Sequence, residues 1–109
     1  MTVELNPALE EVAHALGYRS ALDFTRIKLE QMASQKLIYF KSRVELYEQK
    51  YGMTFNLFSQ RVSDKDDILL KHFGIFEKED DSFDWDDSLH SVQFYQQQLT
   101  ALGHEGIIE

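Results

Sequence analysis

The chain has no cysteine among its 109 residues, which excludes a disulfide framework, thiolate metal ligation and thiol catalysis. It also lacks a long apolar run. The longest, residues 37–40, is far shorter than the roughly 20 residues that a membrane-spanning helix needs. No segment has the pattern of a signal peptide. We therefore expect a cytoplasmic protein without membrane association, folded around one modest core.

Catalytic and cofactor signatures are missing as well. The sequence has only five glycines, and they form neither a phosphate-binding loop nor a G-x-S-x-G nucleophile turn. None of the histidines stands at metal-ligand spacing from another: they are His14, His72, His90 and His104. The sequence therefore predicts no catalytic residue, no metal site and no cofactor, and we expect a non-enzymatic protein.

Basic residues are scarce in one half of the chain only. Residues 1–51 contain seven acids and seven bases, whereas residues 52–109 contain twelve acids and four bases, which accounts for the net charge of −8. Such a balance argues against general nucleic-acid affinity, because binding phosphates needs clustered Lys and Arg. It divides the chain into a neutral region, 1–51, and an acidic region, 52–109.

The neutral region carries clear helix signals. Asn6 followed by Pro7, the only proline, predicts a helix that begins near residue 7, and Gly17 is suited to end it. Ser20 and Asp23 form a capping box, and no glycine or proline follows before residue 52. The pattern predicts a short helix over about 7–16 and a long helix over about 20–51. Alternation over residues 2–6 predicts a very short strand before them.

Apolar residues recur along the long helix with steps of three and four. From residue 33 onward they form a heptad seam that must be buried against another helix. Two interpretations are open, an intramolecular helix hairpin and a dimer interface. The seam positions are Ala33, Leu37, Phe40, Val44, Tyr47 and Tyr51.

The acidic region breaks into shorter pieces. Thr54 can cap a short helix, and Ser63 with Asp66 forms a capping box for a second one over about 68–73, which Gly74 would stop. Residues 77–87 are expected to form an acidic loop, followed by a helix from Asp84 or Ser88 to residue 103. The predicted fold class is all-α: a short N-terminal strand, a short helix, the long helix, two short helices and a C-terminal helix.

The predicted acidic loop places large aromatic side chains among carboxylates. It departs from the calcium-binding loop pattern, because Trp85 stands where glycine is required and Ser91 where the bidentate glutamate belongs. A solvated loop and an acidic docking surface both remain open. In the docking interpretation Phe83 and Trp85 are the anchors, since aromatic side chains are typical of interface centres. The charges that would steer a basic partner are Asp80, Asp81, Asp84, Asp86 and Asp87.

The first 30 residues, with the short strand, Asn6-Pro7, the first helix and the turn at 17–20, resemble the ribbon-helix-helix repressors and antitoxins. This resemblance implies a homodimer in which paired strands direct alternate residues into the major groove of DNA. Those residues are Thr2 and Glu4 here. A carboxylate at that place accepts only from cytosine and is repelled by phosphates, so Glu4 argues against sequence-specific DNA binding.

The segment Tyr47-Glu48-Gln49-Lys50-Tyr51-Gly52-Met53-Thr54-Phe55, the acidic stretch and Trp85-Asp86-Asp87 are similar to small prokaryotic antitoxin-like proteins. The resemblance implies a toxin–antitoxin pair, with dimerisation through the first half and neutralisation of a small basic toxin by the acidic half. The alternative is a structural or adaptor protein that oligomerises through the seam at 29–51, with the acids providing solubility.

Overall fold

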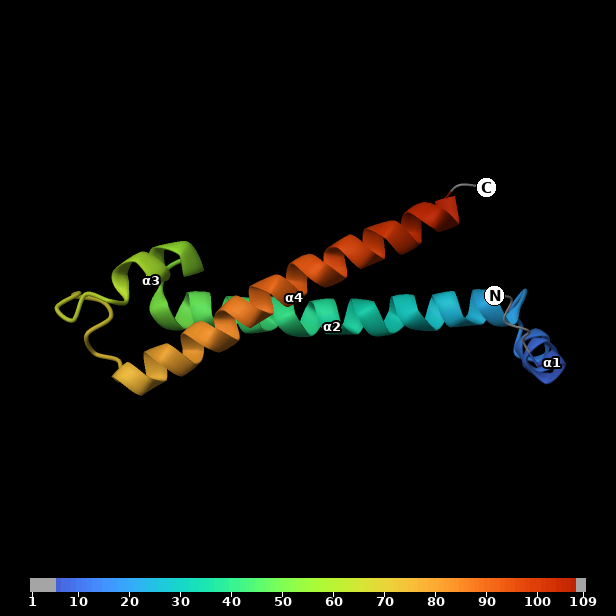
Figure 1. Ribbon diagram of the computed structural model, residues 1–109, viewed down its shortest axis with the longest axis horizontal. Coiled ribbons are helices and arrows are strands. Elements are labelled where there is room, and N and C mark those ends of the chain that lie inside the picture. The colour runs from blue at the N-terminus through green and yellow to red at the C-terminus, as the bar shows by residue number, and fades with distance from the viewer. Residues whose placement is uncertain (1–5, 108–109) are drawn as a thin grey trace.

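A computed structural model of the chain describes the backbone of residues 6–107 and the side chains of residues 6–103. The described residues form four helices and no strand: α1 (Pro7–Ala15), α2 (Ala21–Tyr51), α3 (Phe55–Arg61) and α4 (Ile75–Ile107). Helices α2 and α4 make an elongated hairpin within a molecule 65 Å long (Figure 1). We call the end next to α3 the closed end, and the end next to α1, where the two helices diverge, the open end.

The all-α fold class and the first two helices are confirmed, because local signals determine them. The Asn6 side chain accepts a hydrogen bond from the backbone N–H of Ala8 at 2.9 Å, and Ser20 Oγ accepts one from Asp23 at 2.9 Å. Gly52 ends α2 in the left-handed region at a φ of 68°, which favours glycine. The strand predicted over residues 2–6 falls almost wholly on residues 1–5, which lie outside the described part, and Asn6 acts as a helix cap.

The helix predicted over residues 68–73 is wrong. Residues 62–74 form successive turns without a helix. The predicted capping box is not used, because the carboxylate of Asp67 organises this segment instead. It accepts hydrogen bonds from the backbone N–H groups of Leu69 at 3.0 Å and Leu70 at 3.1 Å, and it pairs with Arg61 at 2.6 Å. These bonds satisfy the backbone in a turn conformation and bury Leu70.

The predicted acidic loop is also wrong, because α4 begins at Ile75 and contains residues 77–87. Acidic residues are favoured in the first turn of a helix, and the Glu77 carboxylate accepts from the backbone N–H of Gly74 at 3.3 Å. No glycine or proline interrupts the sequence from there to residue 102. The helix also continues past Gly103 to Ile107 instead of ending there.

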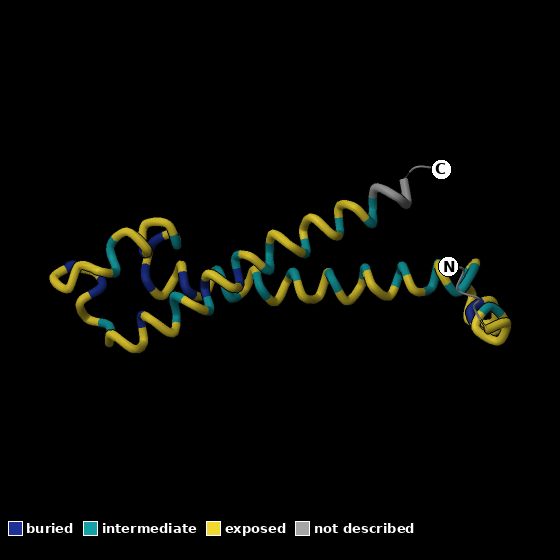
Figure 2. Tube along the Cα trace, in the orientation of Figure 1, coloured by how far each residue is buried: buried dark blue, intermediate teal, exposed yellow. Residues whose placement is uncertain are grey.

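The core lies at the closed end, where α2, α3 and the start of α4 meet (Figure 2). Its buried members are mostly aromatic: Tyr47, Tyr51, Met53, Phe58, Leu70 and Trp85. Toward the open end most residues of α2 and α4 are exposed or half-buried. None of the described helices combines the length and the apolar character required to cross a membrane.

Helix α1 packs across the start of α2 at the open end. Ala13 is buried in this contact, and Tyr18 meets Phe24 edge-on with ring centroids 4.9 Å apart. The Glu10 carboxylate accepts from the backbone N–H of Ala21 at 3.2 Å, which adds a second cap to α2. The corner between α1 and α2 is therefore held by side-chain caps as well as by apolar contact.

Candidate functional site

The predicted anchor Trp85 is fully buried, with 0% of its surface exposed. Its indole packs against Phe58, 5.2 Å between ring centroids, and Phe55, 5.3 Å, and stacks on Tyr47 at 5.7 Å. Because residue 85 belongs to the helix face that meets α2 and α3, it fills the core. The prediction that Trp85 anchors a partner is therefore wrong.

Asp84 binds side chains of α2 within the same chain. Its Oδ2 atom accepts from Arg43 Nε at 3.1 Å and from Tyr47 Oη at 2.5 Å. The two donors hold the pKa of the Asp84 carboxyl below its ordinary value. Burial, reinforced by the bond to Asp84, raises the pKa of Tyr47 to about 12. This carboxylate joins α4 to α2, and it already accepts hydrogen bonds from two side chains of the same chain.

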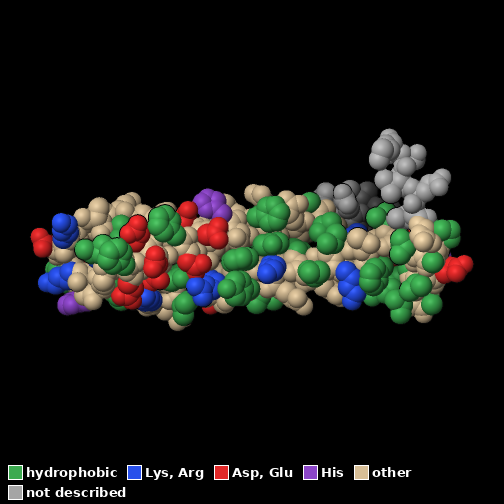
Figure 3. Space-filling view, turned by 60° about the horizontal axis from the view of Figure 1, so that its bottom comes forward, with side chains coloured by type: hydrophobic (Ala, Val, Ile, Leu, Met, Phe, Trp, Pro, Cys, Tyr) green, Lys and Arg blue, Asp and Glu red, His purple; other side chains and the backbone are tan. Residues whose placement is uncertain are grey.

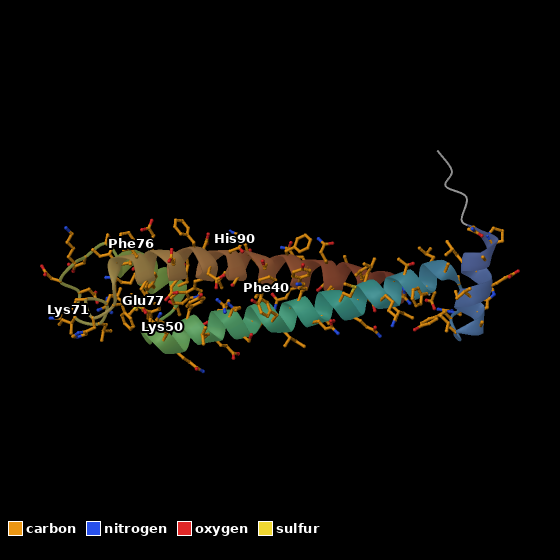
Figure 4. All side chains as sticks on the ribbon, turned by 90° about the horizontal axis from the view of Figure 1, so that it is seen from below. Phe40, Lys50, Lys71, Phe76, Glu77 and His90 are labelled. Atoms are coloured by element: carbon orange, nitrogen blue, oxygen red, sulfur yellow. The ribbon has the colours of Figure 1, made fainter. Side chains whose placement is uncertain are left out.

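Asp81 makes a second link one turn earlier on α4. Its Oδ2 accepts from Lys50 Nζ at 2.6 Å and from Tyr51 Oη at 2.6 Å. Lys50 Nζ also lies 2.7 Å from the Glu77 carboxylate, and these bonds raise the pKa of Lys50 and lower that of Glu77 (Figure 4). Asp81 and Asp84 therefore close the hairpin, each in an ion pair with a base of α2.

The other predicted acids and Phe83 lie on the surface. Asp80, Asp86 and Asp87 are exposed, and 69% of Phe83 is exposed. Sequence reasoning missed Phe76, which is 81% exposed and precedes Phe83 by two helical turns. The signal for it was present, because exposed residues recur along α4 with steps of four and three. We call this set the phenylalanine stripe: Phe76, Asp80, Phe83, Asp87, His90 and Phe94.

The stripe follows an exposed side of α4, and its last member, Phe94, reaches toward α2. Figure 4 shows its members Phe76 and His90 on the outer edge of the helix, whereas Glu77 lies toward Lys50 of α2. Among the described residues, neither Asp80 nor Asp87 takes part in an ion pair. The stripe thus combines exposed aromatic rings with free carboxylates, which is the composition that the docking interpretation requires.

The heptad seam of α2 lies against α4, as the hairpin interpretation predicts. Phe40 stacks on Tyr95 with ring centroids 6.1 Å apart, Tyr47 and Tyr51 are buried, and Val44 packs against the core. These four seam positions are covered by the chain's own helix. An intact hairpin therefore leaves them unavailable to a second copy, and dimerisation would need another surface.

Such a surface exists at the open end, where α2 and α4 diverge. An apolar groove of about 670 Å³ lies between them. Leu29, Met32, Tyr39 and Phe94 are more than half exposed in it, and the seam residue Ala33 forms part of its lining. The remaining lining residues are Gln35, Lys36, Tyr95, Gln98 and Leu102. We refer to this feature as the groove.

The predicted DNA-facing residues, Thr2 and Glu4, lie outside the described residues. Among residues 6–103, no group of three or more histidine or carboxylate side chains is placed to hold a metal ion. His14 Nε2 lies 2.7 Å from the backbone oxygen of Arg19, and His90 Nδ1 lies 2.9 Å from that of Asp86. The imidazole of His14 thus bonds to the turn after α1, and that of His90 bonds to the backbone of its own helix, α4.

No protein-family model matches the chain, and neither a curated protein nor a solved structure matches it.

Proposed function

We propose that the chain is a non-enzymatic protein-interaction module of the antitoxin type, which binds a small basic protein through the phenylalanine stripe. The observation that carries this proposal is the exposure of Phe76 and Phe83 on one helix face beside Asp80 and Asp87. Burying two such rings in a partner supplies affinity, and exposed carboxylates speed the encounter with a basic protein.

The charge distribution supports the same surface. Seven of the twelve acids of residues 52–109 fall between Glu77 and Asp87, at the closed end. Figure 3 shows acidic side chains gathered over this half of the molecule, whereas hydrophobic side chains prevail over the open half on that face. A basic partner would therefore be attracted to the half that carries the stripe.

The proposal is tested with the protein encoded beside this chain's gene, co-expressed with it, as the candidate partner. Phe76→Ser with Phe83→Ser should weaken binding by roughly 30-fold or more, the effect of losing one hot spot or more of about 2 kcal/mol. Ile38→Ser is the matched control, because Ile38 is 69% exposed on α2 and belongs neither to the stripe nor to the groove. Equal affinities of the two variants, or a neighbouring product that does not bind, would count against the proposal.

A second candidate function, a structural or adaptor protein that assembles through α2, is favoured by the groove. In this case the variants with altered groove residues lose assembly, whereas those with an altered stripe leave it intact. The Phe76→Ser with Phe83→Ser variant distinguishes the two candidates, because the adaptor function predicts that this variant still assembles.

A further inference from the structure

The groove carries positive charge and no acid. Among the residues that line it, Lys36 carries a charge and none is acidic, and residues 31–44 of α2 and 88–103 of α4 contain no Asp or Glu. Lys36 itself lines the groove between Met32 and Tyr39, and among the described residues it takes part in no ion pair. A helix that fills the groove would therefore present apolar side chains together with at least one acid.

The phenylalanine stripe has this composition. Around Asp80 it places Phe76 on one side and Phe83 on the other, seven residues apart, or about 10.5 Å along a helix. The groove residues Leu29 and Tyr39 are ten residues apart, or about 15 Å. Two phenylalanine rings and the acid between them thus fit within the length of the groove, and Lys36 lines it.

The groove and the stripe are continuous on one face of the hairpin. Phe94, which is 53% exposed, is the last member of the stripe and also lines the groove. Its neighbours Tyr95 and Gln98 continue that lining along α4. One face of the molecule therefore presents an apolar basic groove at the open end and an apolar acidic stripe at the closed end.

We propose that the groove binds the phenylalanine stripe of a second copy of this chain, so that two hairpins associate side by side and antiparallel. The two copies are related by a twofold axis across their length, and each copy contributes one groove and one stripe. Asp80 of each copy meets Lys36 of the other, and Phe76 and Phe83 enter the groove beside the small residue Ala33. The four long helices then cover the apolar surface that one hairpin leaves open.

This inference rests on the proposed function in one respect, since the stripe serves both contacts. Self-association and partner binding therefore exclude each other, and a basic partner in excess should convert the dimer into a complex with one copy of this chain. Lys36 belongs to the groove alone, so its substitution separates the two contacts.

The test is sedimentation equilibrium of the purified full chain at low and high salt. The unmodified chain should be a dimer. Lys36→Glu and Asp80→Lys should each weaken the dimer at least tenfold, because each places like charges together. The double variant Lys36→Glu with Asp80→Lys should recover most of the loss, since it restores opposite charges in the reverse order.

Lys41→Glu and Glu45→Lys are the matched controls, because both residues are exposed on α2 outside the groove and should leave the dimer unchanged. Circular dichroism checks that every variant stays helical. A monomeric unmodified chain, equal effects of Lys36→Glu and Lys41→Glu, or additive losses in the double variant would overturn the inference. In that event, undiminished partner binding by Lys36→Glu would show that the proposed function stands without it.

Discussion

At the scale of single residues, two neighbouring aromatic side chains have opposite roles. Trp85 is enclosed by the core, whereas Phe83 lies on the surface. Trp85→Ala should therefore lower the free energy of unfolding by about 3–5 kcal/mol, the cost of truncating a large buried aromatic residue. Phe83→Ala should change it by no more than about 0.5 kcal/mol. Urea unfolding followed by circular dichroism measures both, and comparable losses would contradict this assignment.

Ser88 offers a different test of the core. Only 1% of it is exposed, and neither its Oγ nor the Trp85 Nε1 has a hydrogen-bond partner among the described residues. A buried hydroxyl without a partner carries an uncompensated desolvation cost of about 1–3 kcal/mol. Ser88→Ala should consequently leave the free energy of unfolding unchanged or raise it by about 1 kcal/mol. Ser59→Ala, at an exposed position of α3, is the control. A marked loss in Ser88→Ala would mean that this hydroxyl is bonded after all.

At the scale of the helices, local and distant contacts determine different parts of the fold. The ends of α1 and α2 were predictable, because Asn6, Ser20 and Gly52 act within a few residues of their own positions. The start of α4 was not, because its acidic first turns are held by bases from α2. Asp84 lies 41 residues from Arg43, and Asp81 lies 31 from Lys50.

The same reasoning explains the candidate sites. The sequence predicted the exposed acids and Phe83, but it treated Trp85 and Phe83 alike because both stand among carboxylates. Only the helical phase of residues 75–107 separates them, and this phase was hidden by the expectation of a loop. The groove was also unpredictable from the sequence, since it depends on how far α2 and α4 diverge at the open end.

The link between Arg43 and Asp84 should be measurable as a coupling between the two long helices. Asp84→Ala leaves the guanidinium of Arg43 and the hydroxyl of Tyr47 without their acceptor, which typically costs about 1–3 kcal/mol. Combined with Arg43→Met in a double-mutant cycle, the two substitutions should be less destabilising than the sum of the single changes. Strict additivity, measured by urea unfolding, would show that the contact does not stabilise the hairpin.

At the scale of the whole molecule, these links predict how stability depends on pH. Hydrogen bonds and bases hold the pKa values of Asp67, Glu77 and Asp84 below their ordinary values of 3.8 to 4.5. Each carboxylate therefore contributes stability that is fully present above that range. The contribution is lost as the pH falls through the lower pKa values of the folded state.

At alkaline pH the dependence is reversed, and stability is lost as the pH rises. Burial raises the pKa of Tyr47 from 10.0 to about 12, so the folded state retains a proton that the unfolded state releases. This contribution is fully present below about pH 10 and disappears as the pH rises toward about 12. Lys50, whose pKa is also raised by its carboxylate partners, acts in the same direction. The midpoint of thermal unfolding should thus be highest between about pH 5 and pH 10.

Two substitutions test the acidic and the alkaline parts of this pH dependence separately. Asp84→Asn should reduce the loss of the thermal midpoint below pH 5. Tyr47→Phe should reduce the loss above pH 10, where Lys50 still contributes. Because the dimer proposed above is held by Asp80 and Lys36 instead, its sedimentation should respond to salt at neutral pH, where the unfolding midpoint of the hairpin is flat. Stability that responds to pH and association that responds to salt require two different sets of charged residues. The separation of Asp81 and Asp84 on the α2 side from Asp80 and Asp87 on the outer side provides them.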